Sequence, residues 1–123
     1  MRALALAALC AGAAACGDSA YDSGSPAPAQ CTAATATPVS GPVLLEAGNR
    51  FVPSCASVAA GTTVTFTNVD ATPMLHTVTA DGGQFDSGNL AQNQSVSFPF
   101  AGAGTVGIHC ALHPGMRMTL FVQ

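Results

Sequence analysis

The sequence predicts an all-β fold, an antiparallel sandwich of seven to eight short strands in residues 41–123. Polar and apolar residues alternate in short runs, for example over residues 63–67 and 95–100, which is the pattern of half-buried strands. Glycine-containing turns separate these runs, and no helical period occurs after the first residues. Short strands at regular turn spacing are typical of a two-sheet sandwich.

The expected strands follow one another along the chain and are separated by turns. They cover residues 43–47, 51–58, 63–67, 76–79, 95–100, 105–110 and 118–122. The span 81–93 is the least regular part, and we expect either a loop or one helical turn there.

The first 15 residues predict an export signal. Arg2 precedes an apolar run that is too short to span a membrane, and small residues follow it. Residues 13–17 resemble a bacterial lipobox, in which Cys16 becomes the lipid-bearing first residue, although leucine is commoner three positions before the cysteine. The alternative is a plain cleaved signal with Cys16 incidental; Cys10 is a poorer lipid site because Leu9 precedes it. We therefore expect an exported protein, in the periplasm or on the outer cell surface, anchored through Cys16.

Residues 16–40 predict a flexible tether, because they are rich in Ala, Ser, Pro and Thr and cannot bury much apolar surface. The sequence has no lysine, and removal of Arg2 with the signal leaves two arginines, Arg50 and Arg117, against six carboxylates. This charge excludes a basic surface for nucleic acid. We expect a monomer that contacts membrane only through the lipid on Cys16.

The segment 110–116 carries Cys110, His113 and Met116 at the spacing Cys-x2-His-x2-Met, and His76 lies upstream. Two imidazoles, one thiolate and a weakly bound thioether are the ligands of a blue copper site. Structural zinc sites are usually closed by Cys and His alone, so the methionine argues against zinc. The sequence thus predicts one type 1 copper ion, held by His76, Cys110, His113 and Met116.

Strand alternation is consistent with this set of ligands. It puts His76 and Cys110 on core-facing positions and turns His109 outward, which excludes His109 as a ligand. Met116 and Met118 have the same parity in the last strand, so Met118 remains a rival for the axial position.

Residues 42–123 resemble the cupredoxin family, most closely its plastocyanin and amicyanin branch. The matching segments, in order, are residues 51–53, 61–70, 76–78, 85–90 and 104–116. The resemblance implies a Greek-key β-sandwich. It also implies that His76 is the N-terminal ligand, Cys110 the thiolate, His113 the C-terminal ligand and Met116 the axial ligand, at an amicyanin-like spacing.

The chain departs from the family pattern at four places. Val106 and Ile108 stand where aromatic residues are frequent, and Met118 stands where many relatives have glycine. The stretch 70–75 looks slightly long. Thr77 follows the first histidine, where several members have an asparagine that bonds to the cysteine loop, and the sequence leaves open whether the Thr77 hydroxyl replaces that bond. These departures leave the ligand set intact, but the packing and hydrogen bonds around the ligands tune the reduction potential, so its value does not follow from the sequence.

Two cysteines remain, Cys31 and Cys55, once Cys10 and Cys16 are assigned to the leader and Cys110 to the metal. In an exported protein we expect them to form a disulfide. The alternatives are two free thiols, or a Cys31 that is linked to another chain.

The predicted function is transfer of single electrons between redox partner proteins that dock transiently near His113, rather than catalysis. The neighbouring Leu112, Pro114, Gly115 and Met74 would form the docking patch. The main alternative is a copper carrier or scavenger without redox duty. A catalytic copper enzyme would need further histidine-rich sites, and the sequence has three histidines in all. A sandwich that binds no metal is the remaining alternative.

Overall fold

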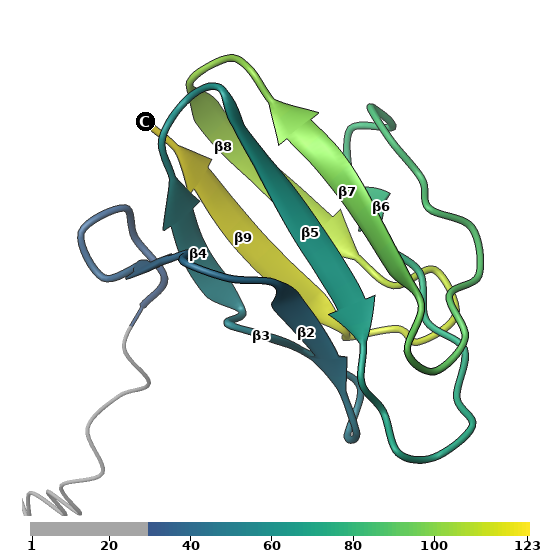
Figure 1. The fold of residues 1–123 in the computed structure, drawn as a ribbon. Coiled ribbons are helices and arrows are strands. Elements are labelled where there is room, and N and C mark those ends of the chain that lie inside the picture. The colour runs from purple at the N-terminus through teal and green to yellow at the C-terminus, as the bar shows by residue number, and fades with distance from the viewer. Residues whose placement is uncertain (1–29) are drawn as a thin grey trace, which may run out of the picture.

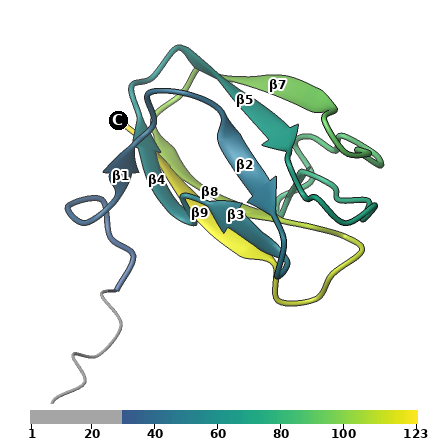
Figure 2. The same ribbon diagram turned by 60° about the horizontal axis from the view of Figure 1, so that its bottom comes forward.

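The computed structural model describes residues 30–123, so the predicted signal, Cys10, Cys16 and the tether up to residue 29 lie outside the described residues. Two β-sheets lie face to face and form the two layers that are visible in Figures 1 and 2. One sheet has five strands in the order β1-β4-β9-β8-β6, and the other has four in the order β3-β2-β5-β7. The strands are β1 Thr37–Pro38, β2 Val43–Glu46, β3 Arg50–Val52, β4 Cys55–Val58, β5 Thr62–Asn68, β6 Thr79–Ala80, β7 Ser95–Phe100, β8 Gly104–His109 and β9 Arg117–Val122. No helix long and apolar enough to cross a membrane occurs in residues 30–123.

The predicted all-β sandwich is confirmed, but its sheets are mixed rather than purely antiparallel. The pairs β1–β4, β4–β9 and β2–β5 are parallel, whereas β2–β3, β5–β7, β6–β8 and β8–β9 are antiparallel. The chain passes repeatedly from one sheet to the other, so strands that are distant in sequence become neighbours and can run the same way. Alternation within a strand reveals its buried face but not the direction of its neighbour.

The core lies between the two sheets and follows the predicted alternation. In β9, Met118, Leu120 and Val122 are buried, and in β5, Val64 and Phe66 are buried. The buried apolar residues are Val43, Leu45, Phe51, Ala56, Val58, Val64, Phe66, Val78, Leu90, Phe100, Ile108, Cys110, Met116, Met118, Leu120 and Val122. The cysteine and the two methionines of the last loop and strand are therefore part of this core.

Two expected strands differ from the structure. Residues 51–58 divide into β3 and β4, which lie in different sheets, because Pro53 has no N–H to donate and the chain changes sheet there. The strand expected at 76–79 is reduced to β6, and His76 instead forms an isolated bridge with Leu90. The span 81–93 holds turns and isolated bridges, and no helical turn.

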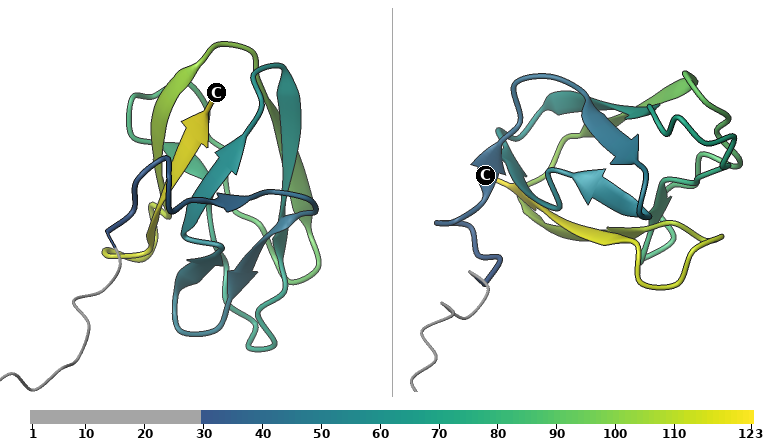
Figure 3. Two further views of the ribbon diagram at one scale, coloured as in Figure 1. Left: turned by 90° about the vertical axis from the view of Figure 1, so that its left-hand side faces the viewer. Right: turned by 90° about the horizontal axis from the view of Figure 1, so that it is seen from below.

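The segment before the sandwich is attached to it. Cys31 and Cys55 form the predicted disulfide, with their Cα atoms 5.5 Å apart. Beyond it, β1 pairs with β4 at the edge of the five-stranded sheet. Figure 3 shows that this segment joins the sandwich on the side opposite to the loops that follow β5 and β8.

Candidate metal centre

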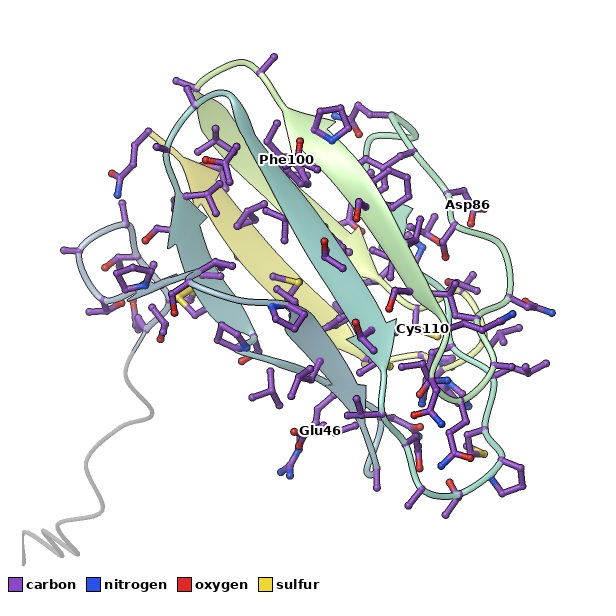
Figure 4. All side chains as sticks on the ribbon, viewed as in Figure 1. Glu46, Asp86, Phe100 and Cys110 are labelled. Atoms are coloured by element: carbon purple, nitrogen blue, oxygen red, sulfur yellow. A yellow bond between two sulfur atoms is a disulfide. The ribbon has the colours of Figure 1, made fainter. Side chains whose placement is uncertain are left out.

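Three side chains with metal-binding atoms meet at the end of the sandwich where β8 ends and β9 begins. The ligand atoms of His76, Cys110 and His113 all lie within 4.8 Å of one another. The Nδ1 atoms of His76 and His113 lie 4.0 Å and 3.5 Å from the Sγ of Cys110, and the two imidazole rings are 5.0 Å apart. The structure therefore brings together the predicted thiolate and both predicted imidazoles. Figure 4 labels Cys110 at this end, among the loops.

Cys110 follows the last residue of β8, on the face of that strand that points inward. Ile108 and Cys110 are buried, whereas the side chain of His109 points outward and its Nδ1 lies 2.5 Å from a carboxylate oxygen of Asp81. Arg117 approaches the same carboxylate. His109 therefore takes no part in the cluster, as its strand parity predicted.

Met116 lies beside the cysteine. Its carbonyl accepts a 3.0 Å hydrogen bond from the backbone N–H of Cys110, and its own N–H donates to the carbonyl of His113 over 3.1 Å. Met116 is also buried and belongs to the apolar core. Met118 pairs with Ile108, two residue pairs further along the two strands. Of the two methionines, Met116 is the one whose backbone is bonded to Cys110.

Thr77 connects the two segments that carry the histidine and the cysteine. Its backbone N–H donates to the Sγ of Cys110 over 3.2 Å. Its hydroxyl accepts a 2.7 Å hydrogen bond from the backbone N–H of Ala111, and it lies 2.9 Å from the hydroxyl of Thr79. The Thr77 hydroxyl thus supplies a bond to the cysteine loop, which the sequence alone had left open.

A buried carboxylate lies behind His76. Asp70 is 2% exposed, and its Oδ2 lies 3.1 Å from the Nε2 of His76. The other carboxylate oxygen accepts hydrogen bonds from the hydroxyl and the N–H of Thr72, at 2.6 Å and 2.9 Å. These bonds from Thr72, together with His76, hold the pKa of Asp70 below its ordinary value, so the group is ionised at neutral pH. The sequence analysis did not identify Asp70.

Asn68 fixes the loop that carries this carboxylate. It is fully buried, and its amide nitrogen donates to the carbonyls of Met74 and Leu90, both at 2.9 Å. Its amide oxygen accepts from the backbone N–H of Asp70 over 3.0 Å. Leu90 is in turn paired with His76 through two backbone hydrogen bonds. A polar residue at a core-facing position of β5 was the one sequence signal that could have revealed this role.

Exposed apolar residues flank the two histidines of the cluster in the sequence. Met74 and Leu75 precede His76, and Leu112 precedes His113; all three are more than a third exposed. His113 itself is half-buried, whereas the other members of the predicted set are buried. Leu75 was not expected in this patch. We call Met74, Leu75, Leu112 and Pro114 the apolar rim.

Two surface hollows of about 490 and 470 Å³ lie elsewhere on the described residues. One is lined by residues 39–42 and by residues of β5, and the other mainly by residues of β3 and the turn after it. None of the four predicted ligands lines either hollow.

The donor set meets the chemical requirements of a copper ion. Cys110 supplies a soft sulfur donor, and both histidines direct their Nδ1 atoms towards it. In residues 30–123, no buried side-chain nitrogen or oxygen lacks a hydrogen-bond partner. The polar groups around the site are thus all hydrogen-bonded, and the three donor atoms face one another.

No protein-family model and no curated protein matches this sequence. Solved structures do match the fold. A purple cupredoxin from Nitrosopumilus maritimus has 23% sequence identity and a TM-score of 0.61, over 68% of this chain and 99% of that one. A variant of amicyanin in its reduced Cu(I) form has 28% identity and a TM-score of 0.58, over 69% and 85%.

A copper-containing nitrite reductase from Thermus scotoductus also matches, with 26% identity and a TM-score of 0.59. The match covers 67% of this chain but 22% of the reductase, so this chain corresponds to a small part of that enzyme.

Proposed function

We propose that this chain, a cupredoxin by its fold and its His–Cys–His–Met site, binds one type 1 copper ion and carries single electrons between proteins outside the cytoplasm. The observation that carries the proposal is the convergence of His76, Cys110 and His113 within 4.8 Å. Bound copper supplies the one-electron change between Cu(II) and Cu(I), and the protein supplies the thiolate, the imidazoles and a fixed frame around them. Amicyanin, which is 28% identical and was solved in a Cu(I) form, is a neighbour that supports copper binding.

The frame around the donors supports electron transfer because it holds them with little freedom to move. The sulfur of Cys110 accepts the N–H of Thr77, and the backbone of Cys110 is bonded to Met116. His76 is bonded at its backbone to Leu90 and at its far ring nitrogen to Asp70. A site that is held by its surroundings in one geometry changes charge with little rearrangement, which favours rapid electron transfer.

The axial ligand in this proposal is Met116 rather than Met118. The N–H of Cys110 is bonded to the carbonyl of Met116, which supports Met116 as the methionine nearer to the cysteine. Met118 lies two residue pairs further along the strands, opposite Ile108 in the apolar core. A long, weak thioether contact completes a blue copper site.

We further propose that redox partners dock on the apolar rim. His113 is the most exposed of the proposed ligands, and the rim residues lie beside it in the sequence or beside His76. The rim carries no charged side chain of its own. Electron-transfer encounters bury small areas and are short-lived, so a small uncharged patch is adequate.

A carrier, rather than an enzyme, is supported by the third histidine of the sequence. His109 is engaged with Asp81 on the outer face of β8 and does not join a further group of metal donors among residues 30–123.

Lipid attachment at Cys16 and a periplasmic or outer-surface position remain part of the proposal, and a mass measurement of the mature protein tests the lipid directly.

A visible and EPR spectrum of the purified protein with Cu(II) tests the main proposal, beside Cys110→Ser. We expect a thiolate-to-copper band with reversible one-electron reduction in the native protein and loss of that band in the variant. A colourless protein that binds only Cu(I) and releases it to another protein would instead support a copper carrier. Absence of metal binding would refute both functions.

A further inference from the structure

Asp70 and His76 form a buried pair behind the cluster. Both side chains are almost fully buried, and they meet at 3.1 Å between Oδ2 and Nε2. The Nδ1 of the same ring is directed towards the sulfur of Cys110. Asp70 therefore bonds to the ring nitrogen that does not face the cluster.

A carboxylate at this position determines which ring nitrogen carries the proton. An ionised carboxylate can only accept hydrogen bonds, so Nε2 must carry the hydrogen, and in the neutral ring Nδ1 then presents its lone pair. Metal-binding histidines commonly donate their other N–H to such a partner, which fixes the tautomer and raises the basicity of the ligand. The contact thus prepares His76 to bind through Nδ1.

The charge of Asp70 is not neutralised by a cationic side chain within residues 30–123. Arg50 pairs with Glu46 on the surface, and Arg117 approaches Asp81. The partners of Asp70 are Thr72 and His76, and both are formally neutral when His76 acts as a ligand. The negative charge therefore acts on the site through the imidazole, in a region shielded from water.

We propose that Asp70 is a positioning residue, which fixes the tautomer of His76 and stabilises Cu(II) more than Cu(I) through its negative charge. The inference rests on the proposed copper function. It predicts that Asp70 lowers the reduction potential, because the potential reports the difference in affinity between the two oxidation states. It also gives the stretch 70–75 a role, since the path of this loop brings the carboxylate behind the ring.

Two variants separate charge from positioning. Asp70→Asn keeps an oxygen that can accept from Nε2 but removes the charge, whereas Asp70→Leu removes both. Glu46→Gln is the matched control, because it removes one carboxylate that pairs only with the exposed Arg50. Cu(II) and Cu(I) affinities, midpoint potential and circular dichroism of the metal-free form are measured for each full-length protein.

We expect Asp70→Asn to weaken Cu(II) binding by about 10–100-fold and Cu(I) binding by less. A tenfold difference between the two losses corresponds to a rise in potential of about 59 mV. Asp70→Leu should show a larger loss, and Glu46→Gln should match the native protein. Unchanged affinities and potential in folded Asp70→Asn would overturn the inference.

A measurement on the native protein covers the case in which the variants do not fold. Long-range proton–nitrogen NMR spectra of the metal-free protein at neutral pH report which ring nitrogen of His76 is protonated. Protonation at Nε2 is expected, and a ring that is protonated at Nδ1 alone would contradict the inference. A native protein without a thiolate-to-copper band would refute the proposed function instead, so the two failures are distinguishable.

Discussion

The backbone N–H of Thr77 donates a 3.2 Å hydrogen bond to the sulfur of Cys110, across 33 residues of sequence. The hydroxyl of the same threonine accepts the N–H of Ala111, so one residue holds both the sulfur and the chain that follows it. The cysteine loop and the histidine segment are therefore joined through protein groups alone. This frame is the basis of the first prediction.

Thr77→Val should loosen the cysteine loop, because the N–H of Ala111 loses its acceptor while the side-chain volume is retained. We expect a loss of about 1 kcal/mol in the free energy of unfolding of the metal-free protein, measured in urea. The copper-loaded variant should show a shifted visible band. Thr77→Ser keeps the hydroxyl and is the control. Equal stability of the Val and Ser variants would argue against a structural role for this hydroxyl.

Met116→Leu and Met118→Leu test the choice of axial ligand. Both replacements nearly conserve volume, so each should cost less than about 1.5 kcal/mol of stability. Only Met116→Leu should change the EPR spectrum and raise the potential, because loss of a weak donor disfavours Cu(II) more than Cu(I). The opposite result, with Met118→Leu changing the spectrum, would reassign the axial position.

Removal of the disulfide should affect stability and not the metal centre. The double variant Cys31→Ser/Cys55→Ser should lose about 2–4 kcal/mol in the free energy of unfolding. Cys55 lies on β4, and β9 separates that strand from β8, which leads to Cys110. The visible spectrum should therefore match that of the native protein. An altered spectrum would mean that the disulfide shapes the site.

A charge on the apolar rim should slow electron exchange between two copies of the protein. Leu112→Asp places like charges opposite each other when two rims meet, so the self-exchange rate should fall about tenfold at low salt and partly recover as salt is added. NMR line broadening in mixtures of the two oxidation states measures the rate. Val52→Asp adds the same charge at an exposed position of β3 and should leave the rate nearly unchanged. Equal slowing by both variants would indicate a net-charge effect.

Much of this site could be predicted because its signals are local. The spacing of Cys110, His113 and Met116 follows from one loop, and the alternation in β8 excluded His109. The disulfide between Cys31 and Cys55 followed from the number of cysteines that remained. Each of these inferences needed only residues that are close in the sequence, or the number of cysteines in the chain.

The contact of Asp70 with His76 could not be predicted in the same way. Polar and apolar residues do not alternate regularly over residues 69–75. The path of this loop depends on hydrogen bonds that Asn68 makes to distant backbone atoms. The division of residues 51–58 and the parallel pairing of β2 with β5 have a similar cause. They depend on which strands become neighbours, and alternation carries no information about that.

The chain enters the sandwich through Cys31 and β1, at the edge of the five-stranded sheet, while Cys110 lies at the far side in Figure 4. A protein immobilised by the residues before Cys31 would consequently turn the edge of His113 towards the bulk solution. On an electrode, attachment at that position would leave the apolar rim open to soluble partners. It would also lengthen the path along which electrons tunnel between the copper and the electrode. Attachment beside Leu112 would reverse both effects.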